Sequence, residues 1–168
     1  MARKGKSFSR EESHVTREEP DEYQKSAIEQ GYSRVSEWDR EKMPPVPPDT
    51  DAEKARKEIE DGFSVQTKSG EEIHFSEEII RHWESEKGYD ERQVNGRLKR
   101  LEMARETVRD PEEIWFQGTQ TAYVQLFRKS TGGLRGCVVF VHGTNVVKTY
   151  FPKDARELEK VRKGIKMK

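Results

Sequence analysis

Apolar residues become regularly spaced only after residue 60 of the chain. Phe63 and Val65 alternate with polar neighbours, and Ile73 and Phe75 do so again beyond the connection Lys68-Ser69-Gly70-Glu71. Alternation with a period of two is typical of a half-buried strand, and a short polar connection with a glycine favours chain reversal. The segment therefore predicts a β-hairpin.

Two helices are predicted after the hairpin. Ser76 can cap the first helix, Glu77 and Glu78 suit the positive end of its dipole, and Gly88 offers a stop. The second helix is predicted over residues 91–108, because apolar residues recur there at spacings of three and four. The apolar positions are Ile79, Ile80 and Trp83 in the first helix, and Val94, Leu98, Leu101, Ala104 and Val108 in the second.

The rest of the pattern predicts strands and two further helices. Residues 110–113, Asp-Pro-Glu-Glu, have the order of cap, proline and acids that starts a helix. Strands are predicted at 122–126, 134–142 and 144–151, and their short connections imply an antiparallel meander. Asp154 is expected to cap a basic C-terminal helix. Its apolar side would hold Leu158, Val161 and Ile165.

These elements predict an α+β domain. The antiparallel sheet would combine the N-terminal hairpin with the C-terminal three-stranded meander, and the two helices would pack on one of its faces. The other face of the sheet would stay free for function.

A proline-rich run marks the expected domain boundary. Residues 43–48, Met-Pro-Pro-Val-Pro-Pro, form a stiff extended spacer that cannot continue a helix. Residues 1–50 are predicted to be a disordered arm and residues 51–168 the folded domain, so removal of residues 1–48 is expected to leave the domain folded. The alternative is an arm that docks onto a partner protein. Its anchors would be Tyr32, Val35 and Trp38.

Apolar and charged residues are distributed unevenly along the chain. Charged residues make up 38% of the sequence and hydrophobic ones 31%, so the apolar residues must be concentrated in part of it. The net charge is +0, yet residues 118–168 hold 11 Lys and Arg against 3 Asp and Glu, a net charge of +8. This third suits a polyanionic partner. The alternative is a basic terminus that only aids solubility.

Several classes of site find no support in the sequence. Cys137 is the one cysteine, so neither an intramolecular disulfide nor a thiolate metal cluster is expected. His14, His74, His82 and His142 form no HxxxH or HExxH pattern, and the chain has no GxxxxGK[ST] or GxSxG motif. No apolar run reaches the ~18 residues of a membrane span, and no apolar core marks a secretion signal.

His82 is the candidate general acid or base, because imidazole groups titrate near neutral pH. The alternative is an ordinary histidine at a helix surface or interface. His74 alternates with Ile73 and Phe75 and is expected to point to solvent. His142 lies at a hairpin tip and could contribute.

The last predicted strand offers two pairs of side chains. Strand alternation places Lys148 with Tyr150 on one face, and Thr149 with Phe151 on the other. Either pair could face a phosphate, with Lys148 supplying positive charge and Thr149 a hydrogen bond. The alternative is that Lys148 is ordinary sheet surface and Thr149 packs at the edge of the core.

A family resemblance rests on the order of these features. A helix with a histidine precedes an arginine-rich helix, then Asp110-Pro111-Glu112-Glu113-Ile114-Trp115, then strands that end in Val146-Val147-Lys148-Thr149-Tyr150-Phe151. Residues 62–153 thereby resemble the phage and polymorphic-toxin nucleases of the barnase/EndoU/colicin/RelE-like (BECR) superfamily. The other matching positions are His82, Arg97 and Tyr123.

The resemblance implies metal-independent cleavage of RNA, in many members tRNA, by the RNA's own 2′-hydroxyl group and without a cofactor. His82 would be the acid or base, Arg97 or Arg92 would stabilise the phosphate, and Lys148 with Thr149 would hold the scissile group. The basic final third would gather the RNA backbone by counterion release. The expected substrate-binding residues are Arg92, Arg128, Lys129, Arg135 and Tyr150.

The resemblance also implies a cytoplasmic location in a bacterial host, with a virion-associated or delivered form as alternatives. Residues 1–50 would contact an immunity protein or a virion protein, and no membrane contact is expected. Two other functions stay open. One is a non-catalytic phage structural or adaptor protein, and the other is an RNA-binding module that does not cleave.

Overall fold

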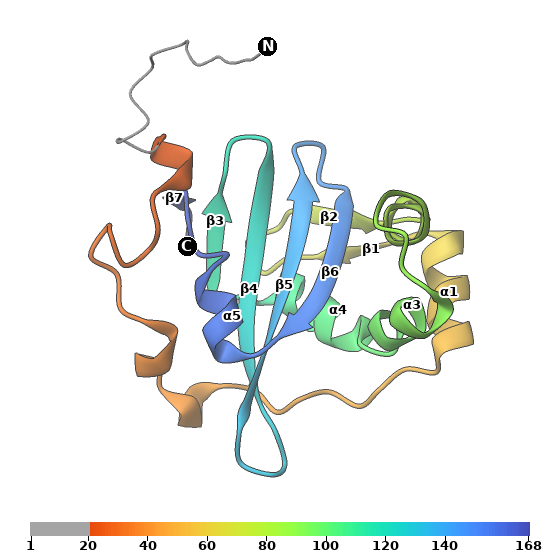
Figure 1. Cartoon of the computed structure of the whole chain (residues 1–168), viewed down its shortest axis with the longest axis horizontal. Helices are drawn as coiled ribbons and strands as arrows, with labels where there is room; N and C mark the ends of the chain where they lie inside the picture. The colour runs from red at the N-terminus through yellow and green to blue at the C-terminus, as the bar shows by residue number, and fades with distance from the viewer. Residues whose placement is uncertain (1–20) are drawn as a thin grey trace, which may run out of the picture.

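A computed structural model describes residues 21–168, and a five-stranded antiparallel sheet forms its centre (Figure 1). The strand order is β6-β5-β4-β3-β7, so the predicted meander is present and two shorter strands extend it. Together with the helices, this sheet confirms the α+β prediction. The strands are β3 (Glu113–Phe116), β4 (Gln120–Arg128), β5 (Leu134–His142), β6 (Val147–Lys153) and β7 (Ile165–Lys166).

The predicted hairpin is also present, as a sheet of its own. β1 (Phe63–Gln66) pairs with β2 (Glu72–Phe75) in an antiparallel register. The backbone N–H of His74 donates to the carbonyl oxygen of Asn145 at 2.8 Å, which ties the hairpin to the turn before β6. The two sheets are therefore linked next to the start of β6.

Helices α1 to α4 lie on one side of the large sheet and around its β6 edge, and α5 lies on the other side (Figure 1). The single helix predicted over residues 91–108 is interrupted at Lys99 and Arg100, so that part of the prediction is wrong. The break lets one half pack against β6 and α1 while the other packs against β4 and β5. The helices are α1 (Ala52–Asp61), α2 (Glu78–Arg81), which continues into a π-helical turn (His82–Glu86), α3 (Glu91–Leu98), α4 (Leu101–Arg109) and α5 (Ala155–Glu159).

The helix-covered face of the sheet carries the larger core. Trp83, Phe75 and Tyr150 are fully or almost fully buried there, with Leu98 and Leu101 from α3 and α4. These residues include most of the apolar stripe that predicted the helices. Its burial provides the main hydrophobic driving force for this half of the fold.

The opposite face of the sheet was expected to be free, and that expectation is wrong. Ala27, Val35 and Met43 are buried against it, on side chains of β3, β4 and β5. Helix α5 covers the same face through Leu158 (Figure 1). The outward residues of the three strands are too apolar to face water, which is the physical reason for this second layer. The apolar side chains on this face are Trp115, Ala122, Val124, Leu126 and Val138.

Residues 21–50 therefore belong to the folded body, which corrects their assignment to a disordered or docking arm. The expected anchors are used within the chain: Val35 is buried, Tyr32 contacts the edge of Trp115, and Trp38 stacks on Arg162. The part of the predicted arm formed by residues 1–20 lies outside the described residues. The segment contains three short 3-10 turns, η1 (Glu22–Gln24), η2 (Val35–Glu37) and η3 (Arg40–Lys42).

Backbone hydrogen bonds fix the proline-rich run beside β4. The N–H of Val46 donates to the carbonyl of Arg128 at 2.9 Å, and the N–H of Arg128 donates to the carbonyl of Pro44 at 2.7 Å. Proline lacks an N–H but keeps its carbonyl acceptor, so an extended Pro-rich segment can still pair on one side. The run is bound, not a free spacer, and we call residues 21–50 as a whole the N-terminal strap.

Two helix predictions near the C-terminus are wrong for one shared reason. Residues 113–116 form β3 instead of a helix, and the C-terminal helix ends at Glu159, with Ile165 and Lys166 pairing beside β3 as β7. Both segments complete the large sheet at its far edge. Long-range strand pairing thus overrides the local helix signals.

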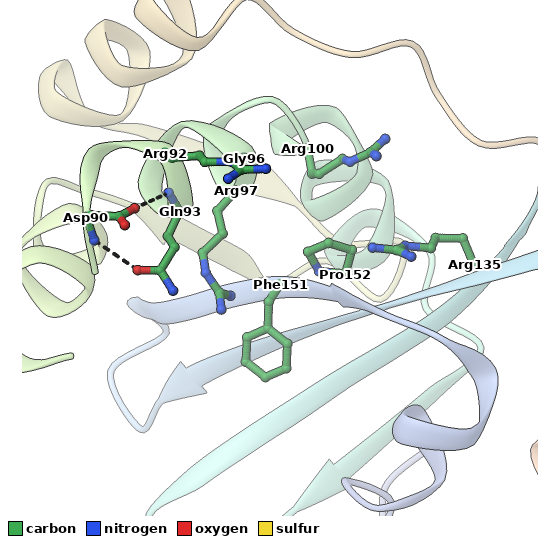
Figure 2. A pocket seen from close by; sticks show the side chains of 9 residues that line it. All are labelled: Asp90, Arg92, Gln93, Gly96, Arg97, Arg100, Arg135, Phe151 and Pro152. Carbon is green, nitrogen blue, oxygen red and sulfur yellow. Dashed lines mark hydrogen bonds between the residues drawn. The ribbon is translucent and has the colours of Figure 1, made fainter. Parts of the chain in front are cut away.

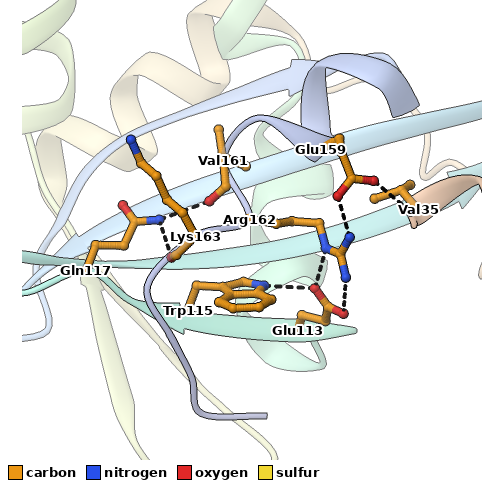
Figure 3. Close-up of polar contacts among 8 residues, drawn as sticks. All are labelled: Val35, Glu113, Trp115, Gln117, Glu159, Val161, Arg162 and Lys163. Carbon is orange, nitrogen blue, oxygen red and sulfur yellow. Dashed lines mark hydrogen bonds and ion pairs between the residues drawn. The ribbon is translucent and has the colours of Figure 1, made fainter. Parts of the chain in front are cut away.

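A buried ion-pair network joins these segments to the N-terminal strap (Figure 3). The fully buried guanidinium of Arg162 donates to Glu113 at 2.6 and 2.8 Å and to Glu159 at 2.5 Å. The indole of Trp115 donates to Glu113, and the N–H of Val35 donates to Glu159, each at 2.8 Å. Burial alone would lower the pKa of Arg162, but the two carboxylates raise it above its ordinary value.

Glu113→Gln is expected to destabilise the protein by roughly 3–5 kcal/mol, because it leaves the buried Arg162 charge without its main partner. Urea unfolding should show this loss. Glu112→Gln is the matched control, since Glu112 is exposed and should change stability by less than about 0.5 kcal/mol. Equal stability of the two variants would contradict the role assigned to the network.

Met43→Ala is expected to lower the free energy of unfolding by about 2–5 kcal/mol, because the Met43 side chain of the strap is buried against the sheet. Thermal melting should detect the change, with the exposed neighbour Glu41→Ala as control. A Met43→Ala protein that melts like the wild type would show that the strap contributes no stability.

Candidate functional site

His82 lies in a hollow of about 310 Å³ beside the start of β6. The hollow brings His82 together with Lys148, as the sequence predicted, and adds His142 from the end of β5. The remaining lining residues are Glu78, Arg81 and Glu86. Two imidazoles, a lysine, an arginine and two carboxylates thus meet in one depression.

A widened helical turn positions His82. The N–H of Lys87 donates to the carbonyl of His82, the i to i+5 bond of the π-helical turn that continues α2. Such turns are rare and often occur at functional sites. The next residue, Trp83, is fully buried, and its indole N–H donates to the hydroxyl of Thr149 at 2.8 Å. This bond fixes the turn, and with it His82, against β6.

Glu86 orients the His82 ring. Its Oε1 lies 2.9 Å from His82 Nδ1. The hydrogen bond with His82 lowers the pKa of Glu86 below its ordinary value, and the charges of Lys148 and Lys87 act in the same direction. Glu86 is therefore ionised near neutral pH and can only accept, so Nδ1 must carry the proton. The unprotonated Nε2 of a neutral His82 is then available as a base.

A β-bulge places Lys148. Phe140 pairs with Thr149, while the adjacent Val141 pairs with Val147, so Lys148 is the extra residue on β6. A bulge redirects its side chain and breaks the alternation of faces. Lys148 is half-buried and lines the hollow of His82.

Tyr150 does not line the hollow with Lys148, although strand alternation grouped the two. Tyr150 turns toward the helices, where it is fully buried and meets Trp83 edge to face at 5.1 Å. Burial raises its pKa well above the ordinary value, and its hydroxyl has no hydrogen-bond partner within residues 21–168. The prediction that Tyr150 binds substrate is therefore wrong.

Thr149 is not brought into the hollow. Its side chain is buried, and its hydroxyl accepts the hydrogen bond from the Trp83 indole. Thr149 therefore helps to position His82 through the neighbouring Trp83, and it does not line the hollow with Lys148.

His142, which the sequence placed at a hairpin tip as a possible contributor, lines the hollow in the structure. It begins the tight turn between β5 and β6, where the N–H of Asn145 donates to its carbonyl and its own N–H donates to Val146. The available signal was the hairpin itself, because a turn of this length must bring residue 142 near residue 148. His74 stays outside the hollow, where its Nδ1 lies 2.7 Å from the Ser64 hydroxyl.

Arg97 lies in a second hollow, of about 580 Å³, along the other end of β6 (Figure 2). Its guanidinium is 4.6 Å from the ring centre of Tyr89 and 5.3 Å from that of Phe151, and it donates to the Tyr89 hydroxyl at 3.2 Å. Arg97 is thus separated from His82. The arginines that line this hollow are Arg92, Arg97, Arg100 and Arg135.

A third hollow, of about 560 Å³, continues the second one, because both are lined by Arg100 and Arg135. It adds Arg128 and Lys129. Part of this charge is already engaged: Arg128 donates to the carbonyl of Met43. We call the two joined hollows the basic groove. All the expected substrate-binding residues except Tyr150 line it.

The basic groove is poor in negative charge. Within residues 21–168, Asp90 is the one carboxylate that lines it, and its side chain accepts from the N–H of Gln93 as the cap of α3 (Figure 2). Arg100 also pairs with Asp49 at 2.9 Å, at the end of the N-terminal strap. The remaining positive charge suits an anionic ligand.

Residues 21–168 contain no group of three or more His, Cys, Asp or Glu side chains arranged to hold a metal ion. None of the helices in this part of the chain combines the length and apolarity that crossing a membrane requires.

Comparison with known proteins identifies the fold family. No curated protein and no solved structure matches the chain. The family model of the phage-Barnase-EndoU-ColicinE5/D-RelE like nuclease 2 matches residues 51–167, more than half of the chain, and confirms the resemblance that the sequence suggested. The chain belongs to this family of phage BECR-type nucleases.

Proposed function

We propose that this nuclease cleaves RNA, without a metal ion, through attack of a 2′-hydroxyl on the adjacent phosphate. The observation that carries the proposal is the hollow that unites His82, His142 and Lys148. In-line attack by a 2′-hydroxyl needs a base, an acid and a cation, and these three side chains supply all of them.

Each group has a defined part in the proposed reaction. Nε2 of His82 takes the proton of the 2′-hydroxyl, and Glu86 stabilises the imidazolium that forms. The O2′–P bond forms, the P–O5′ bond breaks, and protonated His142 gives its proton to the departing O5′. Lys148 stabilises the added negative charge on the phosphorane. The products are a 2′,3′-cyclic phosphate and a 5′-hydroxyl.

The basic groove holds the neighbouring RNA backbone. Phe151 lies three positions after Lys148 on β6, roughly 10 Å along a strand, so the groove lies within a few nucleotides of the histidines. Arg97, Arg92 and Arg135 contact phosphates there, with Arg128 and Lys129 farther along. The Nε of Arg135 is buried without a partner within the described part of the chain, which favours an added acceptor such as a phosphate oxygen.

A non-cleaving RNA-binding module is the second candidate. The separation of Arg97 from His82 favours it, because phosphate binding in the groove does not depend on the histidines. Cleavage assays distinguish the two functions.

Wild-type protein is expected to cleave total RNA in excess EDTA, and His82→Ala is expected to lower the rate by about 10²–10⁴-fold through loss of acid–base catalysis. Gel analysis of a time course measures both. His74→Ala is the matched control, since His74 lies outside the hollow and should keep its rate. His82 is buried, so His82→Gln and a thermal melt check that the fold is intact.

Loss of cleavage in EDTA would contradict the metal-independent mechanism. A His82→Ala protein with full activity would remove His82 from the site, and absence of cleavage by the wild type would favour the binding module.

A single 2′-deoxynucleotide on the 5′ side of the cleaved bond is expected to abolish cleavage there, because the attacking oxygen is missing. Mass spectrometry of the unmodified RNA should find a 2′,3′-cyclic phosphate on the 5′ fragment. Cutting at the deoxynucleotide would show instead that water is the nucleophile.

A further inference from the structure

A pair of half-buried aromatic rings lies between the histidine hollow and the basic groove. Phe140 on β5 and Phe151 on β6 have ring centres 5.9 Å apart at an angle of 51°. Phe140 and His142 are two residues apart on one strand, so they share a face of the sheet about 6.5 Å apart. The pair therefore adjoins the hollow that contains His142.

Phe151, the second ring of the pair, lines the basic groove. It lines the groove with Arg97, and Figure 2 shows its ring projecting from β6 on the side away from α3. The guanidinium of Arg97 lies 5.3 Å and the Nζ of Lys153 lies 4.9 Å from its ring centre. An aromatic surface thus connects two groups of cations.

Phe140 and Phe151 lie at the rim of the layer that the strap and α5 cover. They pack against the cluster that contains Val35, Met43 and Leu158, but each ring stays partly exposed. Aromatic rings beside Arg and Lys suit a nucleotide. Its base can stack on the ring while its phosphate pairs with the cations.

We propose that Phe140 and Phe151 receive an unpaired nucleobase next to the scissile phosphate, so that the substrate is single-stranded RNA. The inference rests on the proposed function for the position of that phosphate. A base inside a duplex has both faces covered by its stacked neighbours, and proteins read such helices by shape and backbone. A base in a single strand can offer its face to the Phe140–Phe151 pair.

Binding of a non-cleavable RNA tests this inference independently of catalysis. A fluorescent oligoribonucleotide with 2′-O-methyl groups is titrated with protein by anisotropy, as a single strand and as a duplex. Phe151→Leu is expected to weaken single-strand binding by about 5- to 100-fold and to leave duplex binding unchanged, since only the single strand loses a stacked base. Phe151→Tyr, which keeps the stacking surface, should bind like the wild type.

Phe116→Leu is the matched control. Phe116 is also half-buried, but it lies on β3, two strands away from β5, and packs on Tyr23. It should bind both RNAs like the wild type, and thermal melts confirm that all variants are folded.

Unchanged single-strand binding by folded Phe151→Leu overturns the inference, as does an equal loss for strand and duplex. Poly-glutamate is the competing ligand. If the wild type binds poly-glutamate as tightly as RNA, and Phe151→Leu alters the affinity for neither polymer, the surface docks an acidic protein and the inference also fails. Selective loss of single-strand binding supports it even if no RNA is cleaved, in which case only the proposed reaction is wrong.

Discussion

The antiparallel pairing of β5 with β6, including its bulge at Lys148, is the constraint on which the site depends. The pairing carries His142 at one end and Phe151 at the other, and the bulge turns Lys148 into the hollow of His82. The same bulge sends Tyr150 into the core, where it packs against Trp83. One extra residue on an edge strand thus separates the side chains that can meet a ligand from those that support the helices.

The second face of the sheet shows how the chain uses residues that precede the family domain. The family match begins at residue 51, yet Val35 and Met43 are buried against β3 to β5. Arg162 holds this layer by joining Glu113 of β3 to Glu159, which in turn accepts from the backbone of the strap. Ion pairs of this kind contribute little net stability compared with apolar packing, but they tolerate few alternative arrangements of the same segments. With both faces of the sheet covered, the histidine hollow and the basic groove lie along the β6 edge.

The candidate site could be predicted in part. His82 and Lys148 were identified from residue type and from their place on a helix and a strand, and they line one hollow. Arg97 was identified as well, but it lies in the basic groove. Strand alternation predicted the surroundings of Tyr150 wrongly, because a bulge leaves no local signal in the sequence. For Thr149 the structure shows the alternative, packing at the edge of the core. The place of His142 in the hollow could not be predicted with the same weight, because a turn histidine acquires chemistry only through the residues that the fold brings beside it.

By itself, the sequence determined the elements with a strong period: the hairpin, the amphipathic helices and the three central strands. Its charge distribution and motif order also determined the family and the basic final third. Only the tertiary structure decided that residues 113–116 and 165–166 are strands, that residues 21–50 cover the sheet, and which faces Lys148 and Tyr150 occupy. Periodicity reports how a segment divides between core and solvent, whereas register, edge pairing and bulges depend on partners far away in the chain.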